Sequence, residues 1–154
     1  MSHDVSTLTT LLEAGHWKAA DEETARLLIA DADVGGYVGV DADEASQIDC
    51  VLLDAIDAAW SSASDGRYGF ARQRRILDEV IAAGHSSNET WREFGRMVGW
   101  VNAREWIEAD EVLYTEDAKA GHLPYTPGFG PVVNTGRIYE GFLGFYARVG
   151  DCLD

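Results

Sequence analysis

Four arginines lie close together in the stretch DGRYGFARQRRI, residues 65–76, and three of them fall within four positions. A guanidinium group binds phosphate and carboxylate groups through paired hydrogen bonds, so such a cluster suggests a site for an anionic ligand. Three interpretations are open: a phosphate-binding loop, a patch that binds nucleic acid, and the first turn of a buried helix. Each interpretation predicts a different function.

The neighbouring residues favour the helix. A phosphate loop needs several glycines followed by Lys and by Ser or Thr, and GRYGFA lacks them. Arg74 and Arg75 precede Asp78 and Glu79 by four positions, which on a helix pairs each arginine with a carboxylate. The formal net charge of −15 repels polyanions, so we expect no nucleic-acid partner. Arg67 either reaches a ligand or, as is more frequent, binds helix-end carbonyl groups or a nearby acid.

Catalytic and metal-binding patterns are missing from the sequence. No nucleophile stands beside a base in a recognisable motif, so we expect a protein that is not an enzyme. No histidine joins a cysteine or carboxylate at metal-ligand spacing, which predicts no metal site. His122 in GHLP either ligates a metalloporphyrin or, as we expect, makes a structural hydrogen bond.

Cysteine usage and the first residues bear on the compartment. The N-terminal stretch MSHDVSTLTTLL shows neither an export signal nor a transit signal, and no window is apolar enough to span a membrane. We therefore expect a cytoplasmic protein without a transmembrane segment. In that compartment Cys50 and Cys152, which lie far apart in the sequence, are expected to be buried, reduced thiols rather than a redox pair.

Apolar residues recur at three- and four-residue intervals along most of the chain, which is typical of amphipathic helices. The pattern predicts an all-α, compact single-domain globule over residues 1–154, with six or seven helices and no strand. Residues 99–114 are expected to form a turn and another short helix. The five tryptophans occupy helix-face positions and are expected in the core. The expected helices begin near Leu8, Trp17, Cys50, Phe70, Ser86 and Ile138.

A long irregular loop separates the last two helical segments. The stretch KAGHLPYTPGFGPVVNTGR, residues 119–137, contains all three prolines of the chain. Loops of this length in a compact domain are usually functional, and Leu123, Tyr125 and Phe129 are costly to expose to water without a use. We interpret the loop as a binding flap in preference to a passive loop packed on the core.

Five ordered fragments of the sequence resemble the genomes-uncoupled-four family of tetrapyrrole-binding regulators of magnesium chelatase in chlorophyll biosynthesis. They are LLEAGHWKAADEET (11–24), IDAAWSSASDGRYGFARQRRI (56–76), WREFGRMVGW (91–100), GHLP (121–124) and RVGDC (148–152). The resemblance implies a helical globule shaped like a cupped hand, which holds protoporphyrin IX or Mg-protoporphyrin IX in an apolar palm. The walls of this palm would be residues 34–48 and 114–138.

The resemblance also implies which residues contact the pigment. Apolar contacts would meet the macrocycle, while Asn134 and Arg137 could meet a propionate, with Arg148 as a second cation. Family members usually carry FPC where this chain has IDC (48–50), which replaces an aromatic residue of the palm by Ile48. The predicted contact residues are Val38, Val40, Ile48, Tyr114, Leu123, Phe129, Asn134 and Arg137.

Two functions from different classes follow. The first is a non-catalytic, monomeric porphyrin-binding protein, without a covalently bound cofactor, that regulates or delivers substrate to magnesium chelatase or a related tetrapyrrole enzyme. Its partner would be the porphyrin-binding subunit of that enzyme. The second is a protein-interaction or signalling module that has the same fold and no longer binds porphyrin. Binding of porphyrin distinguishes the two.

Overall fold

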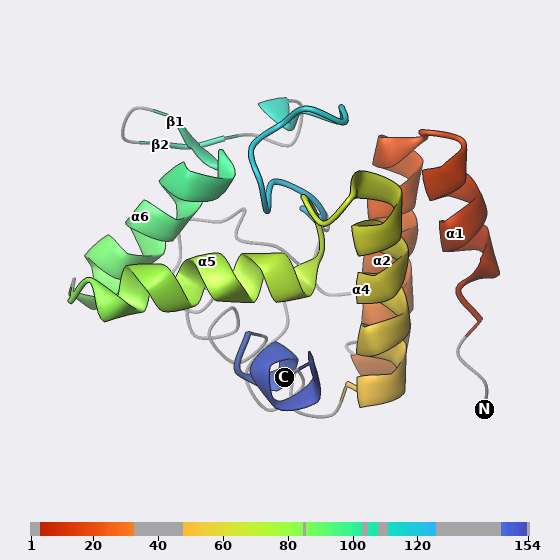
Figure 1. Cartoon of the computed structure of the whole chain (residues 1–154), viewed down its shortest axis with the longest axis horizontal. Helices are drawn as coiled ribbons and strands as arrows, with labels where there is room; N and C mark the ends of the chain where they lie inside the picture. Colours follow the sequence, from red (N-terminus) through yellow and green to blue (C-terminus); the bar gives the residue numbers. More distant parts are fainter. Residues whose placement is uncertain are drawn as a thin grey trace.

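The computed structural model describes residues 4–32, 48–84, 86–102, 105–107, 111–125 and 146–153. These ranges hold the helices labelled in Figure 1 and a further helical segment, residues 146–153. The labelled helices are α1 (Ser6–Glu13), α2 (Trp17–Ala32), α4 (Cys50–Ser64), α5 (Phe70–Ala82) and α6 (Ser87–Val98). The predicted all-α fold class is confirmed.

Helices α1, α2 and α4 form one half of the structure and lie side by side (Figure 1). Trp17 and Trp60 stack with ring centroids 6.1 Å apart, and Tyr68 packs edge-on against both rings. The indole Nε1 of Trp60 donates to Thr24 Oγ1 at 2.9 Å, which satisfies its polar atom inside the core. Trp60 therefore lies in the core, as expected, and the half-buried Trp17 packs against the core and joins α2 to α4.

Helices α5 and α6 and residues 146–153 form the other half, around a second aromatic cluster. The ring of Phe94 contacts those of Trp100 and Tyr146, and Trp100 also contacts Tyr125. All four side chains are buried. Trp100 thus lies in the core, as expected; the side chains of the remaining two tryptophans lie outside the described part of the chain.

A minimal hairpin follows α6 where the sequence pattern predicts a turn and a short helix. Strands β1 (Val101–Asn102) and β2 (Glu105–Trp106) pair antiparallel, so that expectation is wrong for these residues. The chain turns at Gly99, which has a φ of +83° and ends α6 in the left-handed conformation. Trp100 Nε1 donates to the His122 carbonyl and the Trp100 carbonyl accepts from Ile107 N, and these bonds hold the backbone extended.

The turn between α4 and α5 depends on a carboxylate from the middle of α4. Asp57 Oδ1 accepts from Ala71 N at 2.9 Å and so caps the first turn of α5, which begins after Gly69. Gly69 has a φ of +113°, and a Cβ at this position would lie 2.6 Å from Asp57 Oδ1. Burial raises the pKa of Asp57, while its hydrogen bonds to the α5 backbone oppose this effect. Only glycine satisfies both the conformation and the close approach.

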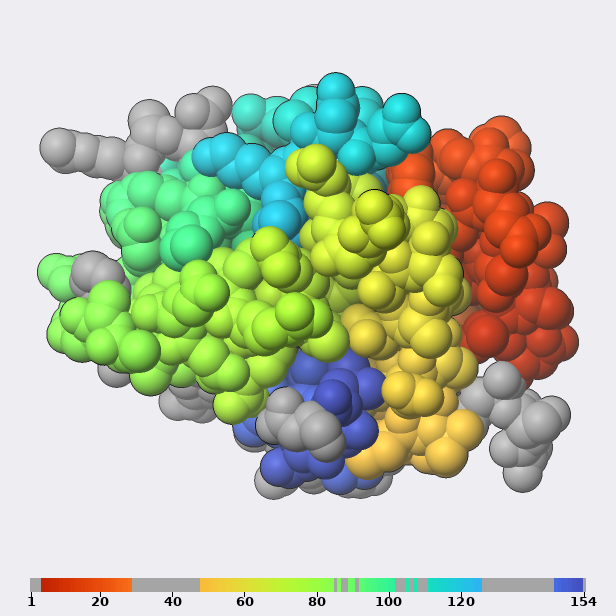
Figure 2. All heavy atoms as spheres, viewed as in Figure 1, coloured from red at the N-terminus to blue at the C-terminus, as the bar shows by residue number. Residues whose placement is uncertain are grey.

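The same turn binds residues 111–125, which we call the anchored segment. Tyr68 OH donates to the Thr115 carbonyl and accepts from Ala118 N, and Arg67 Nη1 donates to the Ala118 carbonyl at 2.8 Å. Arg67 thus has the structural role that we expected, but its partner is a loop carbonyl and not a helix-end carbonyl. Figure 2 shows the anchored segment lying against the surface of this turn. The arginine-rich stretch thus attaches a loop to the helices.

His122 fixes the anchored segment from inside. Its Nε2 accepts from Leu113 N at 2.9 Å, so Nδ1 carries the proton and donates to the Val98 carbonyl at 2.7 Å. Burial, with Lys119 nearby, lowers the pKa of His122, against a smaller opposing effect of the Val98 hydrogen bond. Both ring nitrogens are engaged, so the structural role expected for His122 is confirmed.

Substitution at Gly69 tests the close approach to Asp57. We expect Gly69→Ala to lower the free energy of unfolding by about 2 kcal/mol or more, because it combines backbone strain with displacement of a cap. Gly66→Ala is the matched control, since Gly66 has a φ of +80° and open space at its Cβ position. Its cost should be about 1 kcal/mol, the strain alone. Urea denaturation measures both, and equal losses would contradict the proposed contact.

Protonation of His122 makes stability depend on pH. The unfolded chain gains a proton near pH 6.5, whereas the folded chain, whose pKa is lowered, resists protonation. The free energy of unfolding should therefore fall as the pH drops from about 7.5 to about 5.5. We expect His122→Asn to reduce this slope and the exposed control His16→Gln to retain it. Urea denaturation at a series of pH values measures it, and an unchanged slope in His122→Asn would contradict the assignment.

Candidate functional site

Three of the eight predicted contact residues, Ile48, Tyr114 and Leu123, lie in the described part of the chain. All three belong to the core or pack against it. The remaining predicted contacts lie outside the described residues: Val38, Val40, Phe129, Asn134 and Arg137. The complete site therefore stays a prediction. The structure shows the scaffold from which its two walls extend.

Tyr114 joins the anchored segment to α2. Its hydroxyl donates to Asp21 Oδ2 at 3.2 Å, and the Asp21 side chain is fully buried. Burial raises the pKa of Tyr114, and the neighbouring Asp21 carboxylate raises it further. The phenol thus stays protonated and donates a charge-assisted hydrogen bond. One face of the half-buried ring packs against the core.

Ile48 lies directly before α4, where the C-terminal helical segment meets it. Its side chain is fully buried, and its carbonyl accepts from Arg148 Nε at 2.8 Å. Arg148, proposed from the resemblance as a second cation, therefore also fixes the backbone at the end of one predicted wall.

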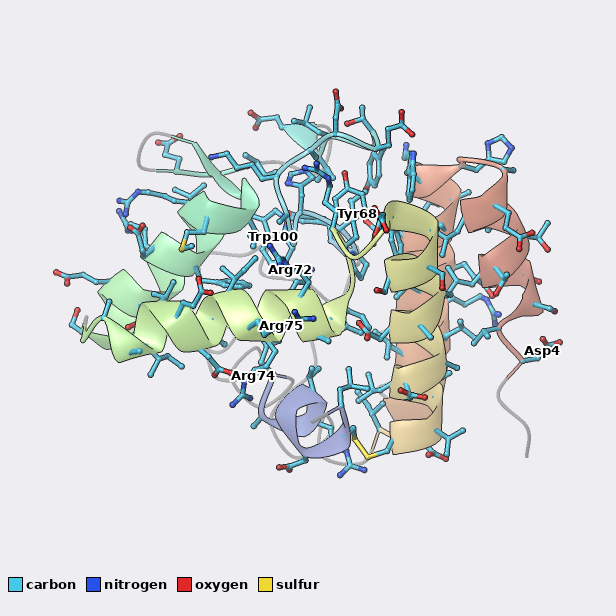
Figure 3. The ribbon with its side chains drawn as sticks, in the orientation of Figure 1. Asp4, Tyr68, Arg72, Arg74, Arg75 and Trp100 are labelled. Atoms are coloured by element: carbon cyan, nitrogen blue, oxygen red, sulfur yellow. A yellow bond between two sulfur atoms is a disulfide. The ribbon has the colours of Figure 1, made fainter. Side chains whose placement is uncertain are left out.

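A disulfide joins Cys50 to Cys152 at the same place, so the expectation of two reduced thiols is wrong in this structure. Figure 3 shows the bond between residues 146–153 and the first turn of α4. Their separation of 102 residues hides this proximity in the sequence, because the fold alone brings the two segments together.

Leu123 is fully buried, and its backbone carbonyl accepts from Gly69 N at 3.1 Å. Next to it, the buried side chain of Gln73 bonds to three groups. Its Nε2 donates to the carbonyls of Gly121 and Pro124, both at 3.0 Å, and its Oε1 accepts from Tyr146 OH at 2.8 Å. The predicted flap is thus packed on the core as far as Tyr125. Leu123 and Ile48 can touch a ligand only after covering groups move.

One hollow of the described surface, of about 810 Å³, lies at the C-terminal end of α4 and is lined mainly by polar residues. Its lining includes Glu116, Asp117 and Ala120, which belong to the second predicted wall. Another hollow, of about 540 Å³, lies between α1 and α4, and half of the residues that line it are alanines of α4. The described residues that line these two hollows do not include the predicted contacts Ile48, Tyr114 and Leu123.

Within the described ranges, no group of three or more His, Cys, Asp or Glu side chains is arranged to hold a metal ion. None of the described helices is both long enough and apolar enough to cross a membrane. The acid-rich surface, from 27 Asp and Glu residues against 12 Lys and Arg, would repel an anionic ligand. A propionate therefore needs a specific cation at its position.

Sequence reasoning missed the residues that organise the scaffold. Gln73 lies among the apolar residues of α5, three positions from both Phe70 and Ile76, and a polar residue at such a position is the signal that it bonds inside the core. Asp57 lies within the family-like fragment IDAAW, but its partner is 14 residues away. Spacing within one helix gives no sign of such a contact.

The sequence of this chain is similar to a known protein family and to a named protein. The GUN4-like family model matches residues 1–135. A protein named tetrapyrrole-binding protein, chloroplastic, from Arabidopsis thaliana is 32% identical over 125 residues, which cover 72% of this chain and 44% of that protein. The chain thus spans less than half the length of this relative.

Solved structures share the fold. The ligand-free structure of Arabidopsis thaliana GUN4 matches with a TM-score of 0.72 and 27% identity, covering 95% of this chain and 96% of that one. The structure of GUN4 from Chlamydomonas reinhardtii matches with a TM-score of 0.71 and 25% identity, covering 94% and 86%. Because the family model covers most of the sequence and the fold agrees over nearly its whole length, this chain belongs to the GUN4-like family.

Proposed function

We propose that this protein binds a porphyrin, protoporphyrin IX or Mg-protoporphyrin IX, without transforming it, and regulates or delivers substrate to magnesium chelatase or a related enzyme. The observation that carries the proposal is the family match over residues 1–135, together with a relative that is named for tetrapyrrole binding. The site would lie between residues 34–48 and 114–138, and the ligand would be held without a covalent bond.

The described scaffold supports this role physically. Hydrogen bonds through Gln73, His122 and Tyr114 fix the near end of one predicted wall, and Arg148 fixes the near end of the other. Walls that extend from fixed ends lose less conformational freedom on binding. Burying about 300 Å² of macrocycle at about 25 cal/mol per Å² contributes about 7 kcal/mol before association costs. With contacts to the propionates, a micromolar Kd is expected.

Titration with protoporphyrin IX tests the ligand class. We expect a shifted Soret band and quenched tryptophan fluorescence, saturating in the micromolar range, because a pigment enclosed in the palm leaves water and lies close to the tryptophans. No spectral change at any accessible concentration would contradict the proposal and favour a protein-interaction module of the same fold.

The variant Arg137→Ala locates the propionate contact within this titration. We expect it to raise the Kd about tenfold, since a charge-assisted hydrogen bond contributes about 1.5–3 kcal/mol. Arg96→Ala is the matched control, because it removes the same charge from an exposed side chain that pairs with Glu93 on α6. Far-ultraviolet circular dichroism verifies that both variants fold. An equal Kd in both variants would remove Arg137 from the site.

Magnesium insertion assays test the proposed regulatory role. At limiting porphyrin, the pigment-loaded protein should raise the rate of magnesium chelatase above that reached with free porphyrin at the same concentration. The effect should be weaker with Arg137→Ala and unchanged with Arg96→Ala. A rate that is independent of the protein would contradict delivery of porphyrin to this enzyme. Porphyrin binding itself is tested by the titration described above.

A further inference from the structure

Two links join the start of α4 to the C-terminal helical segment. The Cys50–Cys152 disulfide is one, and the hydrogen bond from Arg148 Nε to the Ile48 carbonyl, at 2.8 Å, is the other. At its opposite end, the C-terminal segment is fixed to α5 through Tyr146, whose hydroxyl donates to Gln73 Oε1 at 2.8 Å. The disulfide therefore secures one particular end of this segment, residues 149–153.

The disulfide also lies beside the end of the first predicted wall, because Cys50 follows Ile48, the last residue of that wall, by two positions. After the second predicted wall, the first described residue is Tyr146, at the opposite end of the C-terminal segment from Cys152. In Figure 2 the C-terminal segment lies at the surface, between α5 and the first turns of α4. Breaking the disulfide therefore removes one of the two links that hold the backbone around Ile48. Five predicted contacts lie outside the described residues. Val38 and Val40 precede Ile48 in the chain, and Phe129, Asn134 and Arg137 lie between Ile48 and Tyr146.

We propose that thiol–disulfide exchange at Cys50–Cys152 regulates pigment affinity, a regulation that rests on the porphyrin-binding function proposed above. The disulfide fixes the start of α4 beside Ile48, at the end of the first predicted wall, and so maintains the state of higher affinity. Reduction releases residues 149–153 and removes this cross-link from the backbone around Ile48, and the first wall then loses conformational freedom on binding that the disulfide had already removed. In a reducing compartment, a disulfide of this kind is usually transient and redox-sensing.

The exchange needs a dithiol reductant. Both cysteines are half-buried, so a reductant can reach them. One reductant thiolate attacks Cys152 Sγ, the Sγ–Sγ bond breaks, and Cys50 leaves as a thiolate that the positive end of the α4 dipole stabilises. The second reductant thiolate then attacks the mixed disulfide and releases Cys152. Two electrons and two protons pass to the cysteines, and the reductant becomes a disulfide.

Titration of the oxidised and reduced protein with protoporphyrin IX tests the proposal. After treatment with excess dithiothreitol, thiol titration should find two free thiols per chain, and we expect the Kd to rise about fivefold or more, which is typical of coupling between sites. The double variant Cys50→Ser, Cys152→Ser should show the weaker affinity with and without dithiothreitol. This variant also controls for direct effects of the reductant on the pigment.

Amide hydrogen exchange without pigment separates the possible failures. Reduction should speed exchange in residues 149–153 and in the first turn of α4, while α5, which the disulfide does not touch, should be unchanged. Equal affinity in both redox states, with pigment bound, would overturn the regulation. No spectral change in either state would overturn the proposed function and the regulation with it. Resistance of the disulfide to dithiothreitol would show a permanent cross-link and likewise overturn the regulation.

Discussion

The carboxamide of Gln73 is the interaction on which the described scaffold depends. It is fully buried and bonds to three groups from two other parts of the chain, the carbonyls of Gly121 and Pro124 and the hydroxyl of Tyr146. Both of its N–H groups and its oxygen are thereby satisfied, which a buried amide requires, since each unmade bond costs about 1–3 kcal/mol. An apolar side chain of similar size would leave these partners unsatisfied. One amide thus fixes the anchored segment and the C-terminal helix to α5.

Helices were predictable from the sequence because their signals are local. Apolar spacing located α1, α2, α4, α5 and α6. Ser86, near which the sequence predicts the start of a helix, caps α6 by accepting from Glu89 N. The short hairpin after α6 was not predictable in this way, because each strand has only two residues and its shape is set by contacts with His122 and the Trp100 backbone. The prediction for Cys50 and Cys152 was wrong for a related reason, because their proximity arises only from the complete fold.

The candidate site was likewise predictable from the sequence only in part. The sequence resemblance supplied the family, which the comparisons confirm, and the roles of Arg67 and His122 followed from what such residues usually do in loops. The pigment contacts came from the resemblance alone, and the described residues Ile48 and Leu123 lie inside the core. Apolar character shows that a residue avoids water. It does not distinguish a residue that contacts a ligand from a residue that packs in the core. That distinction needs the arrangement of the walls.

The long-range attachments of the C-terminal helix affect how the chain is made. Arg148 bonds a residue 100 positions earlier, and Tyr146 bonds one 73 positions earlier. Contacts between residues distant in sequence slow folding, because their loop-closure entropy is lost before other contacts compensate for it. On the ribosome, α1, α2 and α4 can assemble early, whereas Gln73 keeps an unsatisfied oxygen until Tyr146 has emerged. The amide of Gln73 therefore stays incompletely bonded in the nascent chain until Tyr146 has left the ribosome.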